Sequence, residues 1–73
     1  MDRKEFGDLI KKRRKELGIT QEAISEIAKI SVDYYKDIER GKYRPTWRIW
    51  LRLCAGLQID ILELQRIVVG KKE

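Results

Sequence analysis

Residues 20–41, TQEAISEIAKISVDYYKDIERG, carry two short amphipathic patterns separated by a break of about three residues. The first follows Thr20, whose hydroxyl can accept a backbone N–H of an opening helical turn. The second begins at Ser31, another N-cap residue, and ends at Gly41, where a left-handed backbone costs glycine little. Two helices joined this closely must cross at a large angle, so the segment predicts the geometry of a helix-turn-helix.

The sequence before this segment predicts another amphipathic helix over residues 2–17, with Gly18 as its stop signal. Four apolar residues of this stretch fall on one helical face: Phe6, Leu9, Ile10 and Leu17. The basic run of residues 11–15 lies largely on the other face, where such runs are most often simply solvated. Arg13 should extend its charged end outward.

The sequence after Gly41 predicts an ordered loop and a further helix. Pro45 disfavours a helical backbone at the residue before it, and Thr46 can cap a helix over residues 47–55. This helix has an apolar stripe too wide to be covered by one neighbour, so we expect part of it to stay exposed or to meet another chain.

Residues 61–69 predict a fifth helix, capped by Asp60, and residues 70–73 a frayed tail. No repeat, low-complexity segment or linker divides the chain. The sequence therefore predicts an all-α, compact five-helix fold forming a single domain over residues 1–73, with its core over about 5–69.

The composition limits the kind of partner and chemistry. The 73-residue chain has 17 Lys plus Arg against 12 Asp plus Glu, a net charge of +5. This balance favours a polyanionic partner, although a soluble surface with surplus lysine would have the same composition. The chain has no histidine and a single cysteine, Cys54, which we interpret as a small core residue.

No nucleophile and base can be paired in this sequence, and no glycine loop suited to phosphates is present. We therefore expect no catalytic residue, no metal, no cofactor and no small-molecule substrate. The chain also has no apolar run long enough for a signal peptide or a membrane span, which predicts a cytoplasmic protein with no membrane partner.

A set of residues in a fixed order resembles the Cro and C1-type phage-repressor helix-turn-helix, the XRE family. The set comprises Arg14, the run Gly18-Ile19-Thr20-Gln21-Glu22, Ser31, the run Ile38-Glu39-Arg40-Gly41-Lys42, Pro45, Leu57 and Leu64. The resemblance implies a lambda-repressor-like domain, bacterial or phage-encoded and nucleoid-associated, that binds double-stranded DNA and regulates transcription as a homodimer on an inverted repeat.

The resemblance also implies roles for individual residues. Base-reading candidates on the recognition helix are Val32, Asp33, Lys36 and Asp37. Phosphate-contact candidates are Thr20, Gln21, Ser31, Lys42 and Arg44. Arg14 and Glu39 match a structural salt bridge, and the candidates for a dimer interface are Ile49, Ile61, Leu62, Ile67 and Val68.

Several positions depart from the family pattern. Lys29 occupies the turn position where glycine is usual, and a left-handed lysine costs on the order of 1 kcal/mol. The hydroxyl of Tyr35, which replaces an aliphatic residue, needs a partner or solvent. Asp33 and Asp37 place two carboxylates on the surface expected to face DNA.

Three interpretations of these carboxylates remain open. Asp33 can favour the positive end of its helix while Asp37 pairs with Arg40. Either carboxylate can instead accept a hydrogen bond from cytosine. Alternatively, the helix contacts protein rather than DNA. Lys36 is correspondingly either a base or phosphate contact or a solvated lysine between two aspartates.

The sequence thus supports two functions of different class. The first is a sequence-specific DNA-binding regulator, for which the resemblance implies a repressor or controller role. The second is a protein-interaction module, such as an antitoxin or accessory factor with weak DNA binding.

Overall fold

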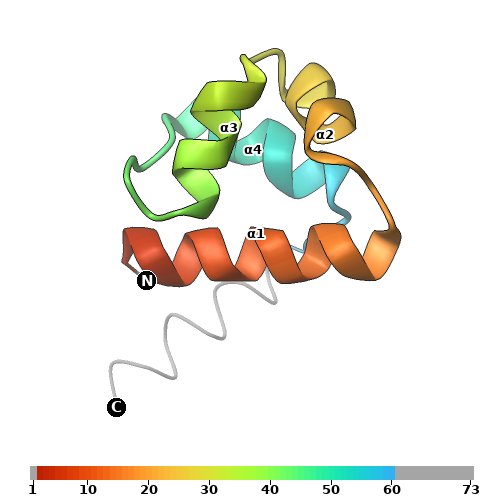
Figure 1. Ribbon diagram of the computed structural model, residues 1–73, viewed down its shortest axis with the longest axis horizontal. Coiled ribbons are helices and arrows are strands. Elements are labelled where there is room, and N and C mark those ends of the chain that lie inside the picture. The colour runs from red at the N-terminus through yellow and green to blue at the C-terminus, as the bar shows by residue number, and fades with distance from the viewer. Residues whose placement is uncertain (1, 61–73) are drawn as a thin grey trace.

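The computed structural model describes residues 2–60, and within them the fold is all-helical. The helices are α1 (Arg3–Leu17), α2 (Gln21–Ala28), α3 (Val32–Glu39) and α4 (Trp47–Gly56). In Figure 1, α1 lies along one side, α3 packs against it, α2 lies beside α3 on the side away from α1, and α4 lies behind α2 and α3. The described part has four helices rather than five, since the fifth was expected over residues 61–69, outside the described residues.

Each helix begins at a short polar side chain that accepts a backbone N–H of the first turn. Thr20 accepts from the N–H of Ala23 at 3.0 Å, and Ser31 accepts from that of Tyr34 at 3.1 Å. Thr46 caps α4 in the same way, with a longer contact of 3.5 Å. These caps confirm the boundaries predicted from local sequence.

The turns use left-handed backbone at the expected positions. Gly18 and Gly41 have φ angles of 69° and 79°. Lys29, between α2 and α3, has a φ angle of 59°, so a lysine takes the conformation that usually favours glycine. The turn of the helix-turn-helix therefore carries local strain.

The hydrophobic core takes side chains from all four helices. Its buried members are Phe6, Ile10, Ile24, Ala28, Tyr35, Ile38, Leu53 and Leu57. Cys54 is only 2% exposed, which confirms it as a small buried residue. Two large apolar side chains of the helices remain exposed to solvent: Ile27 of α2 is 50% exposed and Trp47 of α4 is 68% exposed.

Helix α1 passes very close to the end of α3 because Gly7 has no side chain. A Cβ atom at Gly7 would lie 2.5 Å from the carbonyl oxygen of Glu39, which is closer than real Cβ atoms come. The glycine therefore lets α1 cross directly over the last turn of α3. This crossing brings Arg14 and Glu39 within reach of each other.

Arg13 was expected to extend its charged end outward, but the structure holds its guanidinium at the end of α4. Its Nε donates to the carbonyl oxygen of Leu57 at 3.0 Å, and Leu57 is the C-cap residue of α4. The guanidinium thus satisfies a carbonyl that the end of a helix leaves without an intrahelical donor. It also lies 3.5 Å from Glu16.

Candidate functional site

Helix α3 has a buried face and an outward face. Tyr35, Ile38 and Glu39 are buried against the rest of the fold. The base-reading candidates Val32, Asp33, Lys36 and Asp37 share the other side of the helix, where Asp33 is exposed and the other three are partly exposed. The structure therefore brings these four residues together on one surface.

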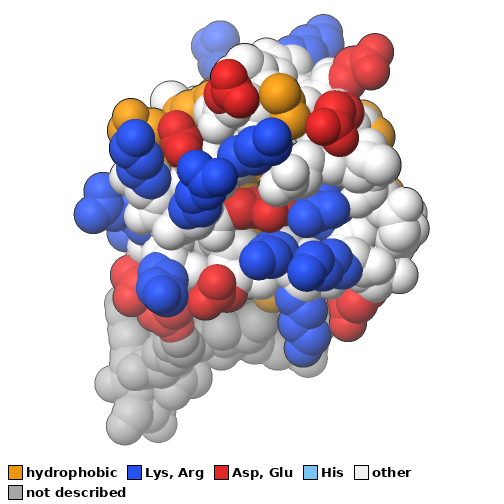
Figure 2. Space-filling model, in the orientation of Figure 1, with side chains coloured by type: hydrophobic (Ala, Val, Ile, Leu, Met, Phe, Trp, Pro, Cys, Tyr) orange, Lys and Arg blue, Asp and Glu red, His pale blue; other side chains and the backbone are white. Residues whose placement is uncertain are grey.

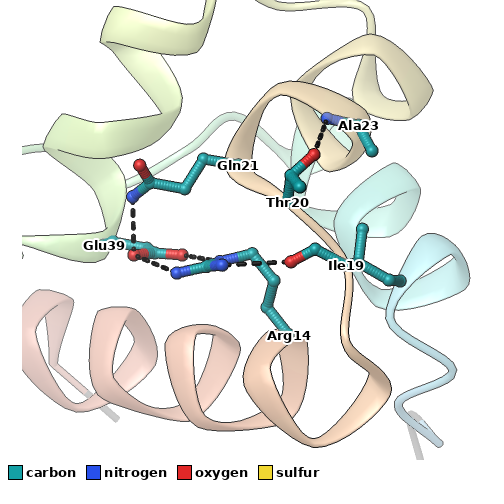
Figure 3. Close-up of polar contacts among 6 residues, drawn as sticks. All are labelled: Arg14, Ile19, Thr20, Gln21, Ala23 and Glu39. Atoms are coloured by element: carbon teal, nitrogen blue, oxygen red, sulfur yellow. Dashed lines mark hydrogen bonds and ion pairs between the residues drawn. The ribbon is translucent and has the colours of Figure 1, made fainter.

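A hydrogen-bonded network fixes α3 to α1 and to the start of α2 (Figure 3). The expected ion pair is present: Arg14 Nε lies 2.7 Å from Glu39 Oε2, with the two side chains 12% and 5% exposed. Arg14 Nη1 also donates to the carbonyl of Ile19 at 3.0 Å. Gln21 Nε2 donates to Glu39 Oε1 at 3.1 Å.

This network gives Gln21 a role that the sequence did not reveal. Gln21 was predicted only as a phosphate contact, whereas its side-chain amide is partly used in holding Glu39. The remaining amide N–H can still donate outward. Gln21 reaches Glu39 only because α2 and α3 cross, so the residue type of Gln21 alone could not predict this contact.

The network keeps Glu39 ionised. Burial acts to raise the pKa of the Glu39 carboxyl, but its polar neighbours Arg14, Tyr35 and Gln21, of which Arg14 acts most strongly, outweigh this effect, and the pKa lies below its usual value of 4.5. The neighbouring Tyr35 hydroxyl is buried without a hydrogen-bond partner among residues 2–60. Burial, followed by the nearby Glu39 carboxylate, raises the pKa of Tyr35. The phenol is thus neutral.

The phosphate-contact candidates lie in three places. Thr20 and Gln21 are at the start of α2, Ser31 is at the start of α3, and Lys42 and Arg44 are in the loop after α3. The capping hydroxyls of Thr20 and Ser31 accept backbone N–H bonds and keep their own protons available for donation.

The loop lysine is held near the surface of the fold. Lys42 Nζ lies 5.4 Å from the centre of the Tyr43 ring, and the Lys42 carbonyl accepts from Arg3 Nη1 at 3.2 Å. Lys42 and Arg44 are both exposed. Both side chains are therefore accessible to an anion.

The acidic residues of α3 have local partners. Asp37 Oδ1 lies 3.7 Å from Arg40 Nη1, so the ion pair considered from the sequence is present. Arg40 is 73% exposed on its side chain, which makes this pair weak. Asp33 lies in the first turn of α3, where a carboxylate favours the helix dipole.

An open hollow lies between α1, α3 and the start of α2, and we call it the basic hollow. Lys4, Lys11 and Lys15 of α1 line it together with Lys36 of α3 and Gln21 of α2. Figure 2 shows Lys and Arg side chains gathered on this face of the molecule. The basic run of residues 11–15 was interpreted from the sequence as a solvated face, so the convergence of α1 with α3 was missed.

The dimer-interface candidates are only partly within the described residues. Ile49 is half-buried and packs against the core of its own chain. Ile61, Leu62, Ile67 and Val68 lie outside residues 2–60. The exposed apolar group of α4 is instead Trp47, whose ring stacks on Trp50 with centroids 6.0 Å apart.

The described part of the chain has neither a metal-binding cluster nor a helix suited to cross a membrane. Residues 2–60 contain no group of three or more histidine, cysteine, aspartate or glutamate side chains placed to hold a metal ion. No helix in that range has the length and apolar character needed to cross a membrane.

A family model and two known proteins match this chain in sequence. A family model described as a helix-turn-helix domain matches residues 5–67. The ImmF control region 10 kDa protein of Bacillus phage phi105 is 32% identical over 71 residues, which cover 94% of this chain and 79% of the phage protein. The transcriptional regulator ClgR of Mycobacterium tuberculosis is 30% identical over 59 residues. These residues cover 81% of this chain but only 53% of that regulator.

Solved structures also resemble the fold. The crystal structure of the clp gene regulator ClgR from Corynebacterium glutamicum matches with a TM-score of 0.83 at 20% identity, covering 94% of this chain and 73% of that one. At this identity the likeness concerns the fold alone.

Proposed function

The chain belongs to the XRE-like helix-turn-helix family, and from this premise we propose that it is a sequence-specific regulator of transcription that binds double-stranded DNA. The family is one of regulators rather than enzymes. A Cro or C1-type repressor or controller role is the specific form that we propose. The names of the phage control-region protein and of ClgR support this reading.

The arrangement of α3 is the observation that carries the proposal. One side of this helix is locked into the fold by Glu39, which bonds to Arg14 of α1 and Gln21 of α2. The other side presents Val32 and Lys36 to solvent. A helix fixed on one face and free on the other can enter the major groove with its side chains in a defined register.

The outward face supports base contacts of a particular kind. Lys36 can donate to guanine O6 and N7, and an aspartate can accept from cytosine N4. The pairing of Asp37 with Arg40 leaves Asp33 and Lys36 as the stronger candidates on this face. Phosphate contacts from Thr20, Ser31 and the loop residues would fix the register of the helix on the duplex.

We further propose a homodimer that binds an inverted repeat. Two-fold symmetry places two recognition helices about 34 Å apart, which corresponds to half-sites with centres about 10 base pairs apart. The exposed Trp47 supports α4 as one part of the dimer surface. The predicted fifth helix, with Ile61, Leu62, Ile67 and Val68, would supply the other part.

The test is selection of bound sequences from random DNA, followed by fluorescence anisotropy at several salt concentrations. We expect a two-fold symmetric consensus and an affinity that falls steeply with salt. Lys36→Gln and Asp33→Asn should alter base preference at single positions, whereas Lys42→Gln should weaken all sequences alike.

A clear set of results would contradict this function. Binding that ignores sequence, or that changes little with salt, is incompatible with it. A stable complex with an endogenous protein, together with only weak nonspecific DNA binding, would instead establish a protein-interaction module such as an antitoxin.

A further inference from the structure

We propose that the basic hollow holds a phosphate of the DNA backbone, so that α1, which lies outside the helix-turn-helix, forms part of the DNA-contact surface. This inference rests on the proposed function and adds residues to it. The residues concerned are Lys11 and Lys15, with Lys36 facing them from α3.

The charges around the hollow are unbalanced. Lys4, Lys11, Lys15 and Lys36 line it, and none of them takes part in an ion pair between residues 2–60. The other charged groups largely cancel: Arg14 pairs with Glu39, and Arg40 pairs with Asp37. Asp8 remains as one carboxylate against four ammonium groups.

Such an excess of like charge disfavours the hollow when it is empty. Ammonium groups within a Debye length, about 10 Å at 0.1 M salt, repel one another. An anion placed among them removes this repulsion and releases counterions from the nucleic acid. The hollow is therefore suited to a phosphate group.

The position of the hollow identifies the source of that phosphate. Gln21, the first residue of α2, and Lys36, on the outward face of α3, both line it. A duplex that lies against α3, with its backbone at the start of α2, passes the mouth of the hollow. The positive end of the α2 dipole favours an anion at the same point.

The geometry of α1 suits a contact to the backbone. Lys11 and Lys15 are four residues apart, so they lie about 6 Å apart along one face of the helix. The hollow has a volume of about 630 Å³, which leaves room for bridging water between ammonium groups and phosphate. Such contacts carry affinity without sequence information.

The experiment compares Lys11→Gln and Lys15→Gln with Lys12→Gln. Lys12 is an exposed lysine of the same helix that does not line the hollow, so it controls for a loss of net charge. Each protein is titrated against the selected operator and against unrelated duplex DNA over a range of salt. Thermal melting followed by circular dichroism verifies that each variant is folded.

We expect Lys11→Gln and Lys15→Gln each to lower the slope of log K against log salt by about 0.9, the value for one phosphate contact. Both should weaken binding to operator and unrelated DNA by the same factor and leave the consensus unchanged. Asp8→Asn should strengthen binding to both, because it removes the remaining carboxylate of the hollow.

Two results would overturn the inference, and they are distinguishable. If the unmodified protein binds its operator specifically and both variants match Lys12→Gln, the hollow holds no phosphate and the proposed function still stands. If the unmodified protein shows no specific, salt-dependent binding, the proposed function fails and this inference fails with it.

Discussion

Replacing Arg14 by methionine tests whether the Arg14–Glu39 pair supports the fold. The substitution removes the 2.7 Å contact and a second one of 3.4 Å, and leaves Glu39 with the single hydrogen bond from Gln21. The Glu39 side chain is only 5% exposed, so water does not replace the lost donors. Stranding a buried charge costs about 3–5 kcal/mol, and we expect about 3 kcal/mol because Arg14 is partly solvated.

For a domain of this size, a loss of about 3 kcal/mol corresponds to a fall in Tm of roughly 12–24 °C. Urea denaturation followed by circular dichroism measures the free energy of unfolding. Arg40→Met is the matched control, since it breaks an ion pair at 3.7 Å in which the arginine is 73% exposed. That control should cost only a few tenths of a kcal/mol.

The dependence on pH gives a second, independent readout. In the unmodified protein the pKa of Glu39 is lowered on folding, so its stabilisation is complete above the usual value of 4.5 and is lost as pH falls through the folded pKa. Without Arg14, burial dominates and raises that pKa instead. The penalty of Arg14→Met should therefore shrink as the pH falls from about 7 to about 4.

A double-mutant cycle with Glu39→Gln isolates the interaction. We expect the double variant to be more stable than the sum of the single losses implies, by about 1–3 kcal/mol, because no buried charge is then left alone. The reasoning is refuted if Arg14→Met costs no more than Arg40→Met, or if its penalty is the same at both pH values.

Three further predictions concern the backbone and the core. Lys29→Gly should raise the free energy of unfolding by up to about 1 kcal/mol in urea denaturation, because φ is 59°, whereas Lys29→Ala keeps the Cβ atom and should bring no such gain. Gly7→Ala should lower Tm strongly, costing about 3 kcal/mol or more, because the new Cβ would meet backbone carbonyls 2.5 and 2.6 Å away. Gly56→Ala should cost less, since its Cβ would meet only isoleucine side chains, and equal losses would contradict this distinction. Burial raises the pKa of the Cys54 thiol to about 11, so alkylation at about pH 8, followed by mass spectrometry, should be slow until urea unfolds the chain. Rapid labelling of the folded protein would show that Cys54 is accessible.

The features that depend on a few neighbouring residues were predictable from the sequence. Thr20, Ser31 and Thr46 cap helices because a short side-chain oxygen reaches a backbone N–H three residues later. Gly18 and Gly41 end helices for an equally local reason, their left-handed backbone. The ion pair of Arg14 and Glu39 was reached only through the family resemblance, because the two residues are far apart in the chain.

The features that depend on how helices cross could not be found in this way. Nothing in the residues around Gly7 shows that α3 passes within 3 Å of where its Cβ would be. Arg13 looked like any basic residue of a solvated run, although it donates to the end of α4. The basic hollow has the same origin, since it joins lysines of α1 to Lys36 of α3.

The two-sided construction of α3 bears on how such a protein can change over generations. Tyr35, Ile38 and Glu39 maintain the fold from one side of the helix, whereas Val32 and Asp33 project from the other. Substitutions at the projecting positions therefore leave the core and the Glu39 network intact. A lineage can therefore acquire a new target sequence by point mutation without first passing through an unstable ancestor. This freedom exists because the eight-residue helix α3 supports the fold with one face and contacts the target with the other.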